Sequence, residues 1–195
     1  NLVAWYKFND YDNVGLDSNL TNTKYHLTNH NGIQLIPTHI VEHSSAFFQN
    51  GGRGDWSQHL QFPPSFNIYN IWNGNGITFS FWYRIIAMQN WFRFLTFQDG
   101  MSSDAGFQIY RNGSEQKIRF SMAGTTAYAD INPGTINDRM WHHILFSVDA
   151  NGVWKLYYDY QDQYISVTCG IPNISYSTSF INWNQYTANE TFYGN

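Results

Sequence analysis

The acidic residues are the first place to look for chemistry, because retaining hydrolysis of a glycosidic bond needs two carboxyl groups about 5 Å apart. Alternate residues of one β-strand would bring such a pair to the same face. The three glutamates, Glu42, Glu115 and Glu190, lie far apart in the sequence. Asp149 and Asp159 fit a turn and a strand end instead. We therefore expect no catalytic residues and predict that the chain is not an enzyme.

Two histidine patterns could indicate a metal centre. His39, Glu42 and His43 match the His-x-x-Glu-His pattern, in which two histidines one helical turn apart hold zinc. The pattern lies between strand-like segments, and on a strand the two histidines would be about 13 Å apart, so we interpret it as a polar loop. His142 and His143 are neighbours on a predicted strand and point to opposite faces, so they cannot share an ion. We expect one of them to be a hydrogen-bonded structural histidine.

Oxygen-bearing side chains gather after the first predicted strand. Asn9, Asp10, Asp12, Asn13 and Asp17 supply several hard oxygens within nine residues, and calcium selects ligands of this kind. The same residues also suit a solvated turn stabilised by Asp and Asn caps. Both interpretations stay open, with calcium as the candidate cofactor and Asn9, Asp10, Asp12 and Asp17 as its candidate ligands.

Aromatic residues beside amides suggest recognition of a neutral ligand. Trp56, Tyr69, Trp72 and Trp91 lie next to Gly, Asn or Gln in loop-like stretches. A flat ring at a loop edge can stack on the apolar face of a sugar while amides bind its hydroxyl groups. The same rings could instead plug the ends of a sandwich or face a neighbouring subunit. Together with Arg93, these four are the predicted carbohydrate-binding residues.

Arginines and an exposed turn offer two other modes of recognition. The tripeptide 53–55 has the Arg-Gly-Asp letters of integrin ligands, but three letters carry little specificity and we interpret it as part of a glycine-rich turn. If the ligand were a sulfated glycan, binding would fall steeply with salt. Arg53, Arg93 and Arg111 would then be the candidate contacts.

The elements that must position these residues are β-strands. Aromatic and β-branched residues alternate with polar ones from end to end, most clearly in 77–86, 141–148 and 153–159. The pair Asn151-Gly152 predicts a tight hairpin between the last two segments. No long stretch has a helical apolar period, so we expect almost no helix. The predicted core contains Trp5, Phe79, Phe81, Tyr83, Phe94, Ile144, Phe146, Trp154 and Leu156.

Composition limits the range of functions. The chain has 195 residues, 19% of them aromatic and only 12% charged, with a net charge of −4. Lysines and arginines are dispersed singly, which argues against nucleic acid as a partner. The longest uncharged stretch, residues 56–83, is interrupted by proline and asparagine, so we expect no membrane insertion. Cys169 is the only cysteine, which excludes an internal disulfide.

An ordered series of short sequence words adds information that periodicity lacks. The words occupy residues 2–8, 17–19, 26–32, 79–84, 107–110, 141–144 and 154–159. In this order they resemble the successive strands of a laminin G-like domain of the concanavalin A-like lectin/glucanase superfamily. The resemblance implies an all-β fold, in which two antiparallel sheets pack as a jelly-roll sandwich, and it covers nearly the whole chain.

The resemblance also implies features at the rim and at the end of the domain. Laminin G-like domains often carry calcium at the sandwich rim, which supports the calcium interpretation of residues 9–17. Residues 191–195 resemble the strand after which such domains usually add one more. We therefore expect residues 1–195 to form a single domain that lacks its last strand, either because that segment was trimmed or because another part of a longer chain fills the gap.

The resemblance and the loop aromatics together predict a non-catalytic carbohydrate-binding or adhesion module of a secreted, cell-surface or virion-surface protein. Its partner would be a glycan or a surface glycoprotein. The alternative is a structural module of a capsid, fibre or surface layer, in which exposed aromatic residues contact neighbouring subunits. An array of glycans would distinguish the two.

Overall fold

A computed structural model describes residues 2–8, 10, 12–20, 22–37, 44–49, 58–88, 90–98, 106–123, 127–173, 178–181 and 192–194. Several sequence-based predictions fall outside these ranges. They concern Asn9, Trp56, the segment 39–43 and the segment 53–55.

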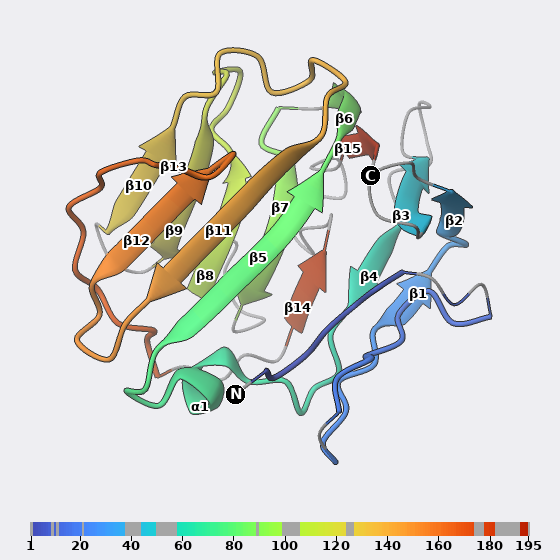
Figure 1. Cartoon of the computed structure of the whole chain (residues 1–195), viewed down its shortest axis with the longest axis horizontal. Helices are drawn as coiled ribbons and strands as arrows, with labels where there is room; N and C mark the ends of the chain where they lie inside the picture. The colour runs from blue at the N-terminus through green and yellow to red at the C-terminus, as the bar shows by residue number, and fades with distance from the viewer. Residues whose placement is uncertain are drawn as a thin grey trace.

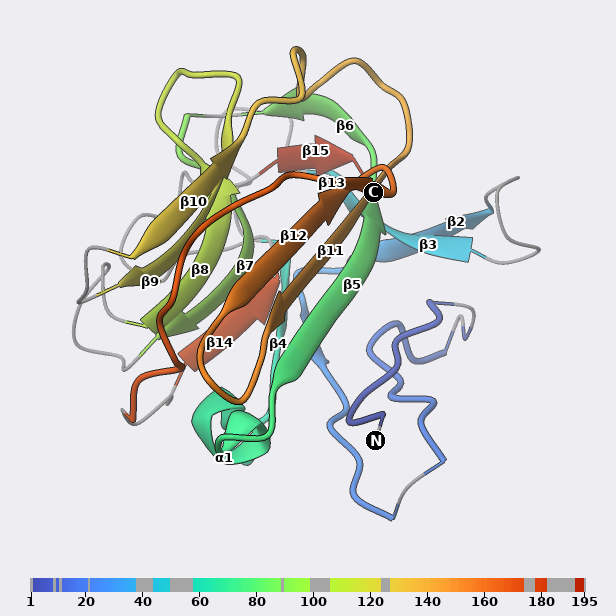
Figure 2. The same cartoon turned by 60° about the vertical axis from the view of Figure 1, so that its left-hand side comes forward.

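Two antiparallel sheets form the body of the molecule (Figure 1). The seven-stranded sheet has the order β1 (Thr28–His30), β4 (His59–Gln61), β14 (Thr178–Ile181), β7 (Arg93–Gln98), β8 (Gly106–Arg111), β9 (Ile118–Ala123) and β10 (Tyr128–Ile131). The four-stranded sheet has the order β13 (Gln161–Asp162), β12 (Trp154–Tyr158), β11 (His142–Val148) and β5 (Ile77–Tyr83). Figure 2 shows this second sheet as a separate layer over the first, as predicted for a jelly-roll sandwich.

A smaller third sheet extends the sandwich. It has the order β2 (Gln34–Pro37), β3 (Ser44–Gln49), β15 (Phe192–Gly194) and β6 (Ile85–Met88). The chain passes from β5 to β6 through the single residue Arg84, so it changes sheets with almost no connecting loop. This short connection ties the end of β5, in the sheet with β11 and β12, to the start of β6 in the third sheet.

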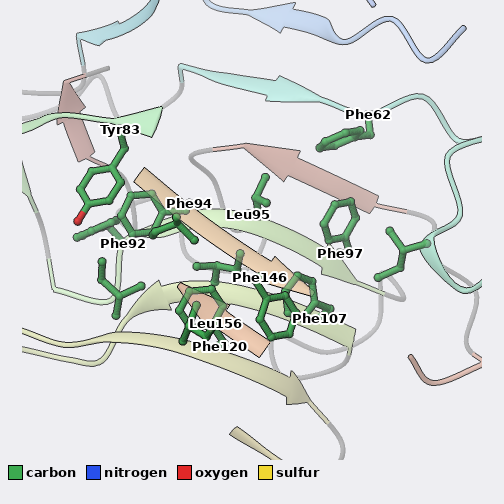
Figure 3. Close-up of a cluster of buried hydrophobic side chains, with 14 of the residues drawn as sticks. Phe62, Tyr83, Phe92, Phe94, Leu95, Phe97, Phe107, Phe120, Phe146 and Leu156 are labelled. Atoms are coloured by element: carbon green, nitrogen blue, oxygen red, sulfur yellow. The ribbon is translucent and has the colours of Figure 1, made fainter. Parts of the chain in front are cut away.

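Aromatic rings from both sheets interleave to make the core (Figure 3). Phe107 of β8 stacks on Phe146 of β11, with ring centroids 5.1 Å apart. Phe97 of β7 meets Phe79 of β5 at 5.6 Å. These contacts follow from the strand alternation, which directs every second side chain of each strand to the same face. The rings therefore hold the two sheets face to face.

Most of the predicted core is confirmed. Tyr83, Ile144, Phe146, Trp154 and Leu156 are buried, as is Phe94, and Phe79 and Phe81 are partly buried against the same cluster.

The prediction for Trp5 is wrong, because its side chain is 49% exposed. The next residue, Tyr6, occupies the inner position instead and contacts Phe62 with ring centroids 6.0 Å apart. Neighbours in extended chain point to opposite sides, so burial of Tyr6 turns Trp5 outward.

The predicted hairpin joins β11 and β12. Val148 pairs with Trp154, and the Gly152 N–H donates to the Asp149 carbonyl at 3.0 Å. The Asp149 carboxylate accepts hydrogen bonds from the N–H groups of Asn151 and Val153, both at 2.8 Å. Gly152 has φ +77°, a left-handed conformation that glycine adopts without steric cost. The Asn-Gly signal in the sequence therefore located this turn correctly.

Helix is nearly absent from the described residues, as expected. The helix α1 spans Ile68–Trp72, and the Asn67 side chain caps it by accepting from the N–H groups of Tyr69 and Asn70. It ends at Asn73, whose φ of 34° is left-handed. Within the described ranges, no helical segment has the length and apolarity needed to cross a membrane.

Two glycine substitutions test the packing of the hairpin. Gly134 and Gly152 both have positive φ, but an added Cβ would meet nothing within 4 Å at Gly134 and would lie 2.8 Å from the Gly170 nitrogen at Gly152. We expect Gly134→Ala to lower the free energy of unfolding by about 1–2 kcal/mol through backbone strain alone. Gly152→Ala should cost about 1–3 kcal/mol more, because the backbone at Gly170 must move. Urea unfolding of both variants measures the difference, and equal losses would contradict the packing described here.

Candidate functional site

Two of the predicted carbohydrate-binding residues meet at the start of β7, in the middle of the seven-stranded sheet. Trp91 lies just before β7, Arg93 begins β7, and Tyr110 of β8 pairs with Arg93 across the ladder. The Trp91 ring stacks on Tyr110 with centroids 6.2 Å apart and planes 27° apart. The Arg93 guanidinium carbon lies 4.4 Å from the centre of the Tyr110 ring, and Nη1 donates to the Trp91 carbonyl at 3.0 Å. We call these three residues the Trp91 cluster.

The Trp91 ring is presented to solvent by a constrained backbone. Its side chain is 45% exposed, whereas Arg93 is 5% exposed. Trp91 has φ +62°, which is unfavourable for a residue with a Cβ and persists only where the surroundings enforce it. On one side the ring lies against Gly113, where an added Cβ would be 3.1 Å from the indole. The indole is thus held by Gly113 and Tyr110 while nearly half of the residue remains exposed.

Arg111 braces the loops on both sides of Trp91. Its Nη1 donates to the Asn90 side-chain oxygen at 3.1 Å, and its Nη2 donates to the Ser114 carbonyl at 2.7 Å. Its Nε donates to the Glu115 carbonyl at 2.9 Å. These contacts give Arg111 a structural part in the site, because they connect the segment before Trp91 to the β8–β9 turn.

A charged pair lies on the same face of the sheet, next to the Trp91 cluster. Arg119 of β9 forms a bidentate ion pair with Asp130 of β10, with both N–O distances 2.7 Å. Tyr110 pairs with Arg119 across the β8–β9 ladder. The hydrogen bonds with Asp130 hold the pKa of Arg119 above its usual value. Since Asp130 neutralises Arg119, this pair adds little net charge beside the exposed ring.

Tyr69 and Trp72 lie elsewhere, on α1, at the opposite end of β5 from β6 (Figure 1). The Trp72 Nε1–H donates to the Asp149 carbonyl at 3.1 Å, and its ring lies so close to Gly170 that an added Cβ would be 2.9 Å away. Both rings are partly buried against the core. They close an end of the sandwich, which is one of the alternatives the sequence left open. A role in carbohydrate binding stays a prediction for these two residues.

Asp17 does not fit a calcium ligand. Its Oδ1 accepts hydrogen bonds from the N–H groups of Trp5 and Asn19, both at 3.0 Å. Its Oδ2 accepts from Asn19 Nδ2 and from the Tyr25 N–H, both at 2.9 Å. A carboxylate offers about four lone-pair positions, and these four donors occupy them. Asp17 is 2% exposed and ties the N-terminal segment to two later segments.

Asp10 and Asp12, the two other predicted calcium ligands within the described residues, lie in a turn near the N-terminus. The Asp10 carboxylate accepts from the N–H groups of Asp12 and Asn13 at 3.0 and 3.2 Å, which is the Asx cap of the plain interpretation. Across the residues that the structure describes, no group of three His, Cys, Asp or Glu side chains could hold a metal ion. Calcium binding by Asn9, Asp10 and Asp12 stays a prediction.

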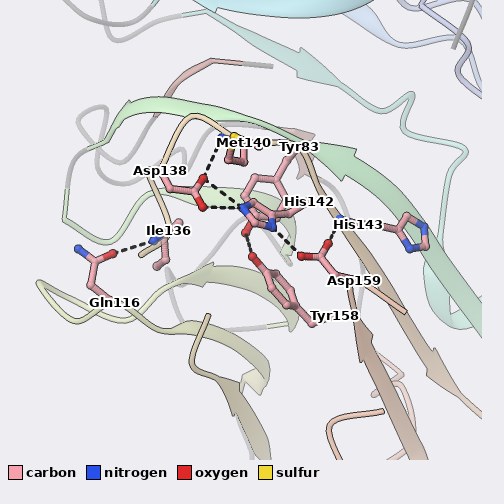
Figure 4. Close-up of polar contacts among 9 residues, drawn as sticks. All are labelled: Tyr83, Gln116, Ile136, Asp138, Met140, His142, His143, Tyr158 and Asp159. Carbon is pink, nitrogen blue, oxygen red and sulfur yellow. Dashed lines mark hydrogen bonds and ion pairs between the residues drawn. The ribbon is translucent and has the colours of Figure 1, made fainter. Parts of the chain in front are cut away.

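A partly buried ionic network, which the sequence did not indicate, lies between β11 and the end of β12 (Figure 4). The His142 Nδ1 is 2.7 Å from an Asp159 carboxylate oxygen, and its Nε2 is 3.1 Å from both oxygens of Asp138. Tyr158 stacks on the imidazole with centroids 5.2 Å apart, and its hydroxyl lies 3.2 Å from that of Tyr83. His142 is therefore the hydrogen-bonded structural histidine that we expected at one of the two positions.

The network shifts the titration of its members. Burial alone would lower the pKa of His142, but its hydrogen bonds to Asp159 and Asp138 outweigh burial and raise the pKa. Burial alone would raise the pKa of Asp138, but hydrogen bonds from the Met140 N–H and from His142 lower it. Burial raises the pKa of Tyr158 to about 12, so this phenol stays neutral. When His142 is protonated, its imidazolium is paired with both carboxylates.

Sequence reasoning did not identify Tyr110 or Asp159 as site residues, because the register between strands could not be predicted. Tyr110 reaches Trp91 through the pairing of β7 with β8, and Asp159 reaches His142 across 17 residues of chain. The strand alternation gave the face of each residue but not the register between strands. The contact between His142 and Asp138 could have been predicted from the sequence, because residues four positions apart can meet in a tight connection.

Comparisons with known proteins agree with this fold. Residues 50–194 match the family model of the concanavalin A-like lectin/glucanases superfamily, and the chain belongs to that superfamily. The match confirms the resemblance drawn from the sequence. A comparison with curated proteins found no match.

Among solved structures, domain 4 of AbnA, an extracellular GH43 arabinanase from Geobacillus stearothermophilus in complex with arabinotriose, is similar to this chain. The two are 16% identical, with a TM-score of 0.62, and the match covers 98% of this chain and 86% of that one. The binding domain of botulinum neurotoxin serotype C1 is 15% identical, with a TM-score of 0.61, over 87% of this chain and 40% of that chain. A third structure is from botulinum neurotoxin type C, a toxin whose cell entry depends on interaction with two ganglioside molecules. It is 14% identical to this chain, with a TM-score of 0.61, and the match covers 91% of this chain and 44% of that chain. At these identities the similarity establishes the fold.

The role of Asp17 can be separated from calcium binding. Asp17→Asn replaces an oxygen that accepts two hydrogen bonds with an amide that donates, so we expect a loss of about 3 kcal/mol in urea unfolding without calcium. Asp12→Asn, at an exposed position of the turn, should change stability by less than about 0.5 kcal/mol. If calcium raises the melting temperature, Asp12→Asn should reduce that rise and Asp17→Asn should keep it. Loss of the rise in Asp17→Asn alone would contradict the assignment.

The pH dependence of stability follows from His142. Because the folded pKa of His142 is above its ordinary value of 6.5, its contribution is complete below pH 6.5 and is lost as the pH rises through the raised folded value. Because the folded pKa of Asp138 is below 3.8, its contribution is present above that pH and is lost on further acidification. We expect the stability difference between wild type and His142→Gln to be larger at pH 5.5 than at pH 9. Parallel unfolding curves for the two proteins across this range would refute the network.

Proposed function

We propose that the chain is a non-catalytic carbohydrate-binding module, and that the Trp91 cluster is its binding surface. The observation that carries this proposal is an exposed indole, held in a strained backbone conformation and supported from behind by Tyr110 and Arg93. Preorganised exposed rings suit sugars, because a C–H-rich sugar face stacks on a ring without ordering it at the moment of binding.

The polar surroundings of Trp91 fit a neutral glycan. Arg93 is buried, and its guanidinium lies over Tyr110 and bonds the Trp91 carbonyl. Arg111 is buried and donates to Asn90, Ser114 and Glu115. These arginines organise the loop from inside, and exposed Asn90 places an amide beside the ring. Hydroxyl groups of a sugar are natural partners for such an amide.

The comparisons support the same ligand class. The arabinanase domain was solved with arabinotriose, and the neurotoxin of type C interacts with gangliosides. A botulinum neurotoxin binding domain in that group was solved with rat synaptotagmin II, a protein receptor. For this chain we propose a glycan or a surface glycoprotein as the partner, on a secreted, cell-surface or virion-surface protein.

Absence of catalysis is part of the proposal, although the superfamily includes glucanases. Among the described carboxylates, Asp138 and Asp159 share one imidazole, Asp130 pairs with Arg119, and Asp17 accepts four hydrogen bonds. Each of them is occupied within the fold. Turnover of a polysaccharide that a single Asp→Asn substitution abolishes would overturn this part of the proposal.

Replacement of Trp91 tests the binding surface. On an array of neutral and sulfated glycans, we expect Trp91→Ala to weaken binding by about 5- to 150-fold, the equivalent of about 1–3 kcal/mol for a stacked aromatic anchor. Trp5→Ala is a matched control, because Trp5 is 49% exposed but lies outside the cluster. Its binding should equal that of wild type, and both variants should keep the wild-type melting temperature within a few degrees.

Salt dependence gives a second readout of the same surface. A neutral sugar held by rings and amides releases few ions, so affinity should change little between 50 and 300 mM NaCl. A steep loss would instead indicate a sulfated glycan and direct contacts with arginine. If no glycan binds and Trp91→Ala behaves like wild type in every assay, the carbohydrate-binding proposal is wrong. The alternative is then favoured, in which the chain is a structural module that contacts neighbouring subunits.

A further inference from the structure

Three rings meet on the outer face of the four-stranded sheet. Trp82 of β5 and His143 of β11 have ring centroids 5.0 Å apart, and Tyr160 of the β12–β13 turn stacks on His143 at 5.2 Å. The ring centroids of Trp82 and Tyr160 are 6.1 Å apart and their planes are inclined by 69°, so each of the three rings contacts the other two. We call these residues the Trp82 cluster.

Strand pairing explains why these rings point away from the core. Trp82 and His143 are direct partners in the β5–β11 ladder, while the following pair, Phe81 and Ile144, faces inward. Figure 4 shows the His143 imidazole on the opposite side of the strand from His142. Trp82 is 40% exposed and Tyr160 is 69% exposed. Two large aromatic side chains are thus open to solvent on this face of the sandwich.

The imidazole at the base of the cluster has unused hydrogen-bonding capacity. His143 is 9% exposed, and its Nε2 lies 2.9 Å from the Ser80 hydroxyl. Its Nδ1 is buried and has no hydrogen-bond partner in the described structure. Burial lowers the pKa of His143, so the ring is neutral at neutral pH. The imidazole therefore adds no charge to the cluster.

The turn that presents Tyr160 is held from inside the protein. Asp159 and Tyr160 both adopt left-handed backbone conformations, with φ of 47° and 66°. The Asp159 carboxylate accepts the His143 N–H at 2.8 Å through one oxygen and contacts His142 through the other. The His142 network therefore fixes the position of Tyr160, and the three rings are preorganised.

Charge and size favour a sugar over a protein as the occupant. The three rings are neutral, and the guanidinium of Arg84, farther along the same face, lies over Trp141 at 5.3 Å. Three neutral rings, the His143 imidazole among them, match one or two sugar units, which stack on rings and offer hydroxyl groups. A protein interface typically covers about 800 Å² on each partner, so a protein occupant would extend well beyond these three residues.

We propose that the Trp82 cluster is a second binding site, specific for a neutral sugar unit of a glycan. It lies on the outer face of the four-stranded sheet, whereas Tyr110 and Arg93 of the Trp91 cluster belong to the seven-stranded sheet. The two sites share a ligand class but no residues, so each can fail without the other. A module with both sites would bind a multivalent glycan surface more tightly than a single free chain.

The test uses Trp82→Ala and Tyr160→Ala, with Tyr164→Ala as a matched control, because Tyr164 is 89% exposed but has no ring contact in the described structure. The probes are arabinotriose and a panel of neutral xylo-, manno- and gluco-oligosaccharides, titrated by calorimetry. We expect Trp82→Ala and Tyr160→Ala to weaken one binding event at least tenfold and Tyr164→Ala to leave it unchanged. Wild-type melting temperatures would establish that the variants are folded.

An NMR readout separates this proposal from the proposed function. On addition of the oligosaccharide that binds best, the imidazole signals of His143 should shift in wild type and in Trp91→Ala, but not in Trp82→Ala. If the His143 signals stay fixed and Trp82→Ala binds like wild type while Trp91→Ala loses binding, the second site is wrong and the proposed function stands. If every oligosaccharide fails, or if His143 responds only to a protein receptor stripped of its glycans, the sugar assignment is overturned.

Discussion

Contact between aromatic rings across the two sheets is the interaction on which the rest of the molecule depends. Phe107 and Phe146 stack from opposite sheets at 5.1 Å, and Phe120 meets the same ring at 5.2 Å. Burial of large rings supplies much of the stabilising free energy in a chain with few charges. Because inward rings satisfy the core, every second residue of each strand is left to face outward. The alternate residues of β5 are exposed on the outer face of the four-stranded sheet, whereas every residue of β7 in the seven-stranded sheet is buried.

Asp159 connects the interior of the sandwich to its surface. One carboxylate oxygen contacts His142 inside the sandwich, and the other accepts the N–H of His143, whose ring faces outward. The adjacent residue, Tyr160, stacks on that outward ring. The contacts of one carboxylate with both histidines thus help to position the exposed Tyr160 side chain. The partly buried network is in this way coupled to the proposed binding surface.

The Trp91 and Trp82 clusters follow the same physical logic. In each, an exposed tryptophan is supported by a ring from a neighbouring strand, Tyr110 in one case and His143 in the other. A residue with positive φ presents a ring in both, at Trp91 and at Tyr160. Strain of this kind is retained where the surroundings enforce it. Rings fixed in this way lose little freedom on binding, which favours recognition of weakly interacting sugars.

The sequence alone determined the all-β class, the superfamily, the hairpin at Asn151-Gly152 and most of the core, because period-2 alternation and turn chemistry are local properties. It also selected Trp91 from the composition of its loop, and the role of Trp91 in binding stays a prediction. Tertiary structure alone decided that Trp5 faces solvent, that Trp72 closes an end of the sandwich, and that the Asp17 carboxylate is saturated by N–H donors. It also brought Tyr110 to Trp91 and Tyr160 to Trp82. Those outcomes depend on strand register and on contacts between distant segments, which alternation along one strand cannot specify.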